Sequence, residues 1–292
     1  EDRLNGWSID FTIGEGFSGY TWASNSHTEQ AYSNEGYWGM KGRIFEVWNN
    51  SQTIPGPCSI YQDLAGLPNG TYVFGAFALG VRSGYDASNP EDYLESQGVY
   101  MFANSDEVPV ATNVPSDTYS WGHGRKVNVA TTVTDGTLRV GMGLKENPTA
   151  FWAAFDNASL YYFGDATVEA ALTGMRKIDV DFDIAVIDTL KKYNMSTECY
   201  ADLLSAAAYG EAATQLAEYE AADDSIRVCC MRARRSISDF KKLTELLGTA
   251  KEVASSEWSE MVQEQVRQLS ATIEKTENDL GNHAIGNEDL QV

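Results

Sequence analysis

Hydrophobic and polar positions alternate every two residues in several short segments before residue 165, as at Val127, Val129 and Thr131. This period is that of a half-buried strand. The turns between the segments carry glycine, as in Pro68-Asn69-Gly70, because glycine accepts the positive φ of tight turns. The pattern predicts strands at 41–48, 60–64, 71–79, 98–103, 126–133, 137–142 and 150–162. Seven or more short strands with no intervening helices favour an antiparallel β-sandwich over an α/β fold.

After residue 165 the apolar spacing changes to three and four residues, which places these residues on one face of a helix. The clearest sets lie in 226–247 and 258–280, and two more helices are expected at about 167–193 and 197–221. Ser196 or Thr197 is the expected cap of the second of these helices. Asp223 and Asp224 are expected at the start of the next helix, where negative charge favours the helix dipole. Short connections predict a bundle of three to four helices.

Composition marks the boundary between the two patterns. All seven prolines, 20 of the 25 glycines and 26 of the 33 Phe, Tyr and Trp residues precede residue 165. Proline and glycine punctuate strands and turns, and their absence permits long helices. We therefore expect a multidomain β + α chain, with a β-sandwich at 1–164 and an all-α helical bundle at 165–292. The tail from about residue 281 is expected to be frayed.

The chain is acidic, with 21 Lys and Arg against 42 Asp and Glu and a net charge of −21. A nucleic-acid partner is not expected, because phosphate neutralisation needs clustered basic residues. Four cysteines and three histidines make neither a disulfide scaffold nor a zinc pattern. No apolar stretch approaches the roughly 20 residues of a transmembrane helix.

Three motifs occur in order in the first part: SIYQDLAGLPNGTY at 59–72, VYMFAN at 99–104 and WAAFDNASLYY at 152–162. Together they resemble the galactose-binding-like jelly rolls of secreted multidomain surface proteins of Bacteroidetes, over roughly residues 5–164. The resemblance implies a jelly-roll sandwich of the carbohydrate-binding-module type. Domains of this kind serve as glycan-binding modules, adhesion modules or passive spacers.

Sugar recognition needs flat aromatic faces together with planar polar groups for the hydroxyls. Aromatic residues in glycine-rich segments are the better candidates, because loops carry function. The alternative is that these aromatics belong to the core, to which we assign Trp48 and Trp152. The expected ligand-binding residues are Trp22, Trp38, Tyr85, Trp121, His123 and Arg125.

The resemblance also implies one structural calcium ion. Calcium binds several carboxylate and carbonyl oxygens, and Asp156 lies at the closing-strand position where such families place a carboxylate, with Asp10 or Glu15 contributing from the start of the chain. Alternatively, Asp156 caps a turn or forms a hydrogen bond with the N-terminal loop. The acidic segment 179–183 lacks the glycine and glutamate of a calcium-binding loop and is expected to form an acidic helix face.

These observations favour a non-catalytic glycan-binding or adhesion module whose partner is a cell-surface polysaccharide. One alternative is a structural subunit whose helical bundle binds a protein partner. The other is a glycoside hydrolase or its accessory, although the sequence contains no nucleophile or metallohydrolase motif. The resemblance implies export to the periplasm or outer surface, with a lipoprotein signal absent from this sequence. A start without Met or an apolar segment fits that expectation.

Overall fold

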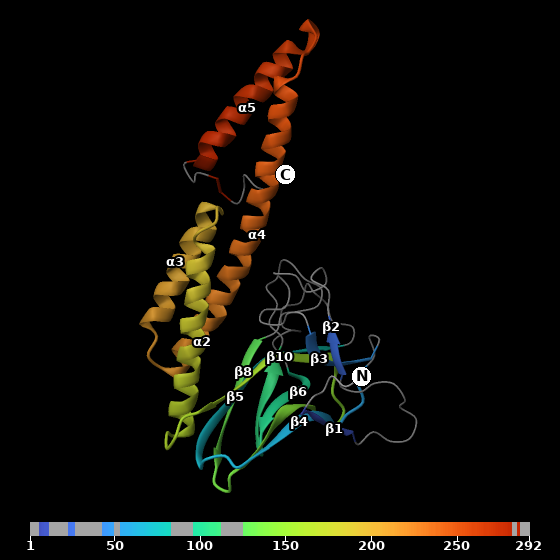
Figure 1. The fold of residues 1–292 in the computed structure, drawn as a ribbon, viewed down its shortest axis with the longest axis vertical. Helices are drawn as coiled ribbons and strands as arrows, with labels where there is room; N and C mark the ends of the chain where they lie inside the picture. The colour runs from blue at the N-terminus through green and yellow to red at the C-terminus, as the bar shows by residue number, and fades with distance from the viewer. Residues whose placement is uncertain are drawn as a thin grey trace. The chain divides into compact units, whose positions relative to one another are not determined.

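The computed structural model describes residues 6–11, 23–26, 43–49, 53–82, 96–111, 125–281 and 285–286. Ten strands of these residues form two five-stranded antiparallel sheets (Figure 1). Sheet A has the order β1 (Ser8–Phe11), β4 (Cys58–Ala65), β9 (Thr137–Leu144), β6 (Ser96–Ala103) and β7 (Asp106–Ala111). Sheet B has the order β2 (Ala23–Ser26), β3 (Arg43–Trp48), β10 (Ala150–Tyr162), β5 (Gly70–Arg82) and β8 (Arg125–Val133).

The core lies between the two sheets. Every second side chain of a strand points to the opposite sheet, and these side chains form one buried apolar cluster. Its members include Ile60, Val99, Met101, Leu138 and Met142 from sheet A and Val47, Phe74, Ala76, Val129 and Phe155 from sheet B. The predicted β-sandwich is thereby confirmed, whereas the finer description as a galactose-binding-like jelly roll stays a prediction.

All seven predicted strands are present, and β10 has the predicted bounds. The alternation did not reveal β1, β2 or β7, which contain four, four and six residues. Strand β7 is the last strand of sheet A and contains Asp106, Glu107 and Pro109, residue types that are depleted in strands. Residues 106–111 therefore form a strand because they pair with β6, although their own preference for strand is weak.

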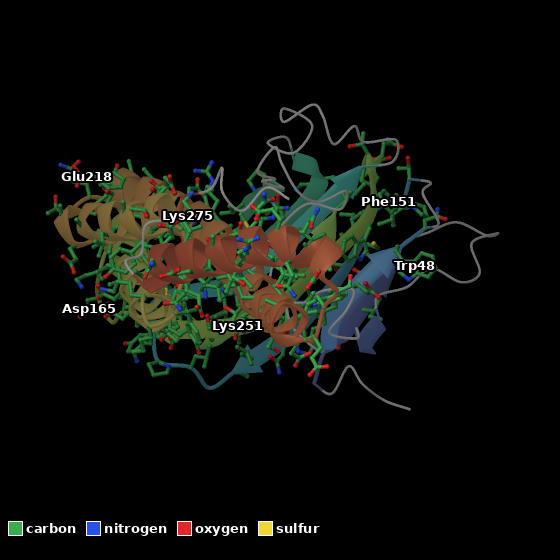
Figure 2. All side chains as sticks on the ribbon, turned by 90° about the horizontal axis from the view of Figure 1, so that it is seen from above. Trp48, Phe151, Asp165, Glu218, Lys251 and Lys275 are labelled. Carbon is green, nitrogen blue, oxygen red and sulfur yellow. The ribbon has the colours of Figure 1, made fainter. Side chains whose placement is uncertain are left out.

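The two tryptophans assigned to the core have different environments. Trp152 is buried, and its indole N–H donates to the buried carboxylate of Glu46 at 2.9 Å. The core assignment of Trp48 is wrong, because 45% of this residue is exposed at the end of β3 (Figure 2). Trp48 pairs with Trp152 in the register of β3 and β10, and both point away from the central core.

The first turns of α2 (Val168–Leu190) belong to the sandwich. Ala171 and Met175 are buried against Val73 and Ala130 on the outer face of β5 and β8. The chain divides into two compact units, Glu1–Arg176 and Lys177–Val292. The change from strand to helix occurs between Tyr162 and Val168, as the composition predicts, but the compact division lies inside α2.

The remaining helices are α3 (Thr197–Ala212), α4 (Leu216–Ser255) and α5 (Gln263–Gly281), with the short 3-10 helix η2 (Glu260–Val262) before α5. Gly210 of α3 allows close packing, because an added Cβ would lie 2.9 Å from Val180 and 3.1 Å from Ile226. Helix α5 lies beside the C-terminal half of α4 (Figure 1), where Lys251 and Glu277 form an ion pair. The description as a helical bundle stays a prediction.

One predicted cap is confirmed and one predicted helix start is wrong. The Ser196 side chain accepts the N–H of Cys199 at the start of α3. Helix α4 begins at Leu216, seven residues before Asp223, and the Glu218 carboxylate accepts the N–H of Gln215. Asp223 therefore lies within α4, where its carboxylate pairs with Arg227 one turn later, at 3.6 Å and shielded from solvent.

The acidic segment 179–183 is helical, as expected, and Asp181 is exposed. Asp179 and Asp183 are buried. None of the helices formed by the described residues is long and apolar enough to cross a membrane.

Candidate functional site

The outer face of sheet A brings together aromatic and charged residues from three strands. Ile60, Met101 and Met142 point into the core, so the residues that alternate with them point outward. The register places Tyr61 of β4 opposite Gly141 of β9, and Gly141 opposite Phe102 of β6. In the neighbouring row Ser59 lies opposite Gly143, and Gly143 opposite Tyr100.

The two glycines let the rings of β6 lie across β9. A Cβ added to Gly143 would be 2.6 Å from both Cζ and the hydroxyl oxygen of Tyr100, and a Cβ added to Gly141 would be 2.8 Å from Cζ of Phe102. The rings therefore occupy the space above the glycine backbone. We call the set Tyr61, Tyr100, Phe102, Gly141 and Gly143 the aromatic floor.

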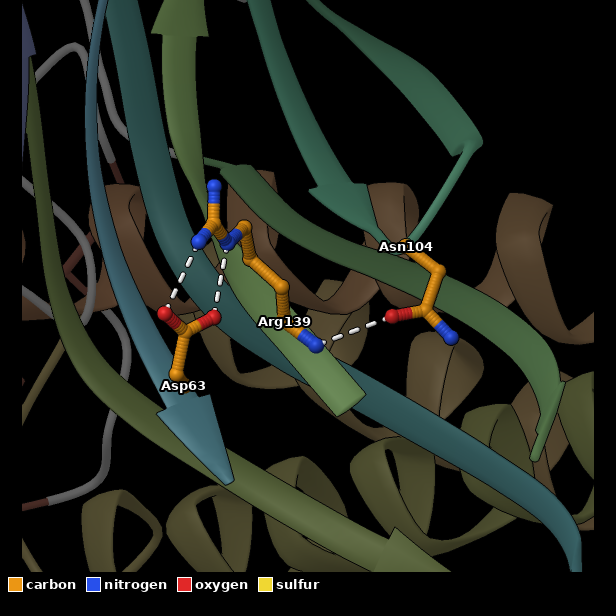
Figure 3. Close-up of polar contacts among 3 residues, drawn as sticks. All are labelled: Asp63, Asn104 and Arg139. Carbon is orange, nitrogen blue, oxygen red and sulfur yellow. Dashed lines mark hydrogen bonds and ion pairs between the residues drawn. The ribbon is translucent and has the colours of Figure 1, made fainter. Parts of the chain in front are cut away.

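A bidentate ion pair joins Arg139 of β9 to Asp63 of β4, two residues along each strand from Gly141 and Tyr61 (Figure 3). Arg139 Nε and Nη2 donate to the two carboxylate oxygens of Asp63 at 2.7 and 2.8 Å. The Arg139 backbone N–H donates to Oδ1 of Asn104 at 2.9 Å, and Asn104 has a φ of 53° in the turn between β6 and β7. The Arg139 guanidinium carbon lies 4.0 Å from the ring centroid of Tyr61. Guanidinium, carboxylate and ring thus hold one another in fixed positions.

The ion pair also fixes the charges of its members. The hydrogen bond from Arg139 lowers the pKa of the Asp63 carboxyl, and the same hydrogen bond raises the pKa of the Arg139 guanidinium. Both side chains are about half exposed, at 48% for Arg139 and 57% for Asp63. Asp63 is therefore an ionised acceptor within reach of a ligand.

A second ion pair joins Lys145 to Glu107 of β7, which lies opposite Phe102. The Lys145 Nζ atom is 4.0 Å from the ring centroid of Tyr100. Burial raises the pKa of the Tyr100 hydroxyl, and the nearby charges of Glu107 and Asp10 raise it further. Tyr100 therefore stays a neutral hydroxyl that donates and accepts hydrogen bonds. Its ring is half-buried, like that of Tyr61.

This arrangement suits a ligand that has both an apolar face and many hydroxyl groups. Aromatic rings contact the C–H faces of such a ligand, and the carboxylates and cations beside the rings bind its hydroxyls. The charged groups are fixed to the sheet by their partners, so binding orders few side chains.

Of the ligand-binding residues expected from the sequence, the structure describes only part of one. Five of them, Trp22, Trp38, Tyr85, Trp121 and His123, lie outside the described residues. Of Arg125 the structure describes the backbone, as the first residue of β8 in sheet B. The expected site in the loops stays a prediction.

Two of the expected calcium ligands, Asp10 and Asp156, lie on different sheets. Asp10 lies opposite Ser59 on the outer face of sheet A, whereas Asp156 lies opposite Phe77 on the outer side of sheet B. Glu15 is outside the described residues. In the part of the chain that is described, no three His, Cys, Asp or Glu side chains are grouped to hold a metal ion. Calcium binding stays a prediction, but Asp10 and Asp156 do not form a shared site for it.

A signal for the outer face of sheet A is present in the sequence. Alternate positions along β9 and the residue that follows it read Arg139, Gly141, Gly143 and Lys145, so two glycines lie between two cations. Glycine is depleted in strands unless another group approaches closely. This pattern indicates a face that is occupied by rings from neighbouring strands.

Comparison with known proteins finds distant likenesses in structure. No family model and no curated protein matches the chain. The structure of TmCBM61 in complex with beta-1,4-galactotriose is 13% identical, covers 55% of this chain and 90% of that chain, and has a TM-score of 0.33. A cyclase from Fischerella sp. TAU is 14% identical, with 56% and 86% covered and a TM-score of 0.36. The cleaved adhesin domain of Lys-gingipain from Porphyromonas gingivalis is 15% identical, with 55% and 92% covered and a TM-score of 0.32. Likeness at this distance assigns no activity to this chain.

Proposed function

We propose that the chain is a non-catalytic module that binds a glycan on the outer face of sheet A. The observation that supports it best is the half-buried pair of rings Tyr61 and Tyr100 in the aromatic floor, each in contact with the cation of an ion pair, Arg139–Asp63 and Lys145–Glu107. The floor offers apolar contact, and each ion pair offers a charged donor beside a charged acceptor for sugar hydroxyls. The exported, cell-surface setting that the sequence resemblance implies belongs to the same proposal.

The charges on this face support binding rather than hydrolysis. A glycosidase needs one carboxylic acid that stays protonated because its pKa is raised, together with a second carboxylate. Arg139 lowers the pKa of Asp63, and Glu107 is paired with Lys145. Neither carboxylate is in the environment of a general acid. A protein partner on the helices, the other alternative from the sequence, stays a prediction.

Replacing the tyrosines of the floor tests the proposal. Affinity electrophoresis of the full chain in gels containing neutral plant and mucin polysaccharides should show retardation by at least one of them. We expect Tyr61→Ala and Tyr100→Ala each to weaken binding about tenfold, because each removes a ring contact worth on the order of 1 kcal/mol. Tyr161→Ala is the matched control, since Tyr161 is an exposed tyrosine on β10 of the other sheet. Equal retardation of all three variants would exclude this face as the binding site.

A further inference from the structure

Helix α5 and the C-terminal half of α4, which lie side by side (Figure 1), share only a narrow contact. Residues spaced by three and four form one stripe on each helix. The stripes are Leu243, Leu247, Ala250 and Ala254 on α4 and Val266, Leu269, Ile273, Thr276 and Leu280 on α5. Among residues 263–280 of α5 only Ile273 is buried, and none of residues 241–255 of α4 is buried. The Lys251–Glu277 ion pair is about half exposed, and such pairs stabilise little.

Beyond α5 the chain returns to the start of α3. Ile285 is only 4% exposed, and its carbonyl oxygen accepts the backbone N–H of Thr197, the first residue of α3, at 3.3 Å. A Cβ added to Gly286 would lie 2.8 Å from Oε1 of Glu198. Both residues therefore lie directly against the first turn of α3. We call Ile285 and Gly286 the strap.

The strap completes the N-terminal end of α3. The first N–H groups of a helix have no partner within the helix. The Ser196 side chain accepts the N–H of Cys199, and the Ile285 carbonyl accepts the N–H of Thr197. Ser196 is fully buried, and its own N–H donates to Oγ of Ser236 on α4 at 2.8 Å. The strap is thus bound where α3 meets the first half of α4.

The strap also limits where the end of α5 can lie. Ile285 follows Gly281, the last residue of α5, by four positions, and four residues span at most about 14 Å when fully extended. While Ile285 is bound, the end of α5 therefore stays close to the start of α3. The other end of α5 is joined to α4 through η2. Without the strap, α5 would depend on its narrow contact with α4, and packing supplies most of the stability of a helix in a protein.

We propose that the strap is a latch for α5. When Ile285 leaves the start of α3, α5 separates from α4 as a unit and uncovers the stripe of α4 that begins at Leu243. The buried residues of α4 run from Tyr219 to Phe240, so the first half of this helix stays folded without α5. Opening of one element at a lower free energy than global unfolding is common in proteins.

The latch is independent of the proposed glycan site. It lies in the compact unit Lys177–Val292, whereas the outer face of sheet A lies in the unit Glu1–Arg176. Loss of glycan binding would leave the latch unaffected, and loss of the latch would leave glycan binding unaffected.

Amide hydrogen exchange of the full chain, followed by mass spectrometry, tests the latch. In Ile285→Ala we expect residues 263–281 to exchange at least tenfold faster, because removal of buried methyl groups destabilises the closed state. Residues 216–240 of α4 should change by less than about twofold, because they open separately. Leu246→Ala is the matched control, since Leu246 is 61% exposed on α4, and it should leave the exchange of α5 unchanged.

Each other outcome would overturn the latch. Unchanged exchange of α5 in Ile285→Ala would show that the strap does not hold this helix. An equal rise in residues 216–240 would make Ile285 a part of the common core instead. An α5 that exchanges like an unfolded peptide in the unaltered chain would have no closed state to hold. Ile285→Val, which keeps a branched side chain, should retain most of the protection of α5, and its failure to do so would also count against the latch.

Discussion

Gly141 and Gly143 lie on the same side of β9, yet an added methyl group meets different obstacles at the two positions. At residue 141 it would overlap the Ile60 carbonyl oxygen, which belongs to the backbone, and lie 2.8 Å from Phe102. At residue 143 it would meet the far end of the Tyr100 side chain, 2.6 Å away. We expect Gly141→Ala to lower the free energy of unfolding by about 1–3 kcal/mol and Gly143→Ala to lower it less, because Tyr100 can move.

Of the two variants, Gly143→Ala should weaken glycan binding more than Gly141→Ala, although it should lower stability less. Gly143→Ala displaces Tyr100 from the floor, so it should weaken glycan binding about as much as Tyr100→Ala in a chain that is otherwise folded. Urea denaturation and affinity electrophoresis of the two alanine variants make the comparison. If Gly143→Ala bound normally, the position of the Tyr100 ring would not matter for the site.

The binding face could be predicted only in part at the level of single residues. The motifs around Tyr61 and Tyr100 were visible, and alternation tells which residues of a strand share a face. Trp48 shows the limit, because its strand pattern resembles that of Trp152, although one is exposed and the other meets Glu46. The exposure of a residue depends on which other elements cover it, and the sequence of its own strand does not specify those elements.

At the level of elements, α2 and α4 meet through buried charges. Burial raises the pKa of Asp183 to about 8, and the charge of Asp223 and a hydrogen bond with it add to the rise, while Arg227 opposes it. Asp179 on α2 also faces this group, and Cys230 lies near it on α4. At neutral pH Asp183 is therefore mostly protonated and shares a hydrogen bond with Asp223.

This protonation makes stability depend on pH. An exposed aspartate has a pKa of about 3.9, so between pH ~4 and ~8 the folded chain holds a proton that the unfolded chain has lost. The free energy of unfolding should therefore fall as pH rises through this window and then level off. Asp183→Asn should remove that slope, and Asp181→Asn, an exposed position on the same helix, should keep it. Urea denaturation followed by far-UV circular dichroism at a series of pH values provides the measurement, and an unchanged slope in Asp183→Asn would contradict it.

The sequence pattern predicted which elements exist better than it predicted how they adjoin. Helices were expected at 167–193 and 197–221, and α2 and α3 are found at Val168–Leu190 and Thr197–Ala212. Strands β4 and β6 are distant in the chain, and both pair with β9. A period of two residues states which side of a strand is buried, but not which strands are neighbours. The aromatic floor depends on that neighbour relation.

At the level of the whole molecule, the compact division at Arg176 predicts where the chain can be cut. A fragment ending at residue 164 loses Ala171 and Met175, which are buried on β5 and β8, and the Ala166 carbonyl that accepts the Thr71 hydroxyl at 2.6 Å. A fragment ending at residue 176 keeps them. Burial of one methionine side chain contributes about 1.5–3 kcal/mol, so we expect the longer fragment to melt roughly 5–10 °C higher.

Scanning calorimetry of the two fragments measures this difference. Met175→Ala in the longer fragment is the matched variant. It should lower the melting temperature most of the way to that of the shorter fragment, because it removes the buried Met175 side chain from the contact. Equal melting temperatures of the two fragments would show that the start of α2 does not stabilise the sandwich.

The position of Pro109 in β7 has a consequence for crowded conditions. An open sheet edge invites pairing with another chain, and proline and charge are common means of preventing it. Strand β7 ends sheet A, Pro109 has no backbone N–H, and Asp106 and Glu107 bring negative charge to the same strand. Copies of this chain held side by side would therefore resist joining their A sheets edge to edge into aggregates.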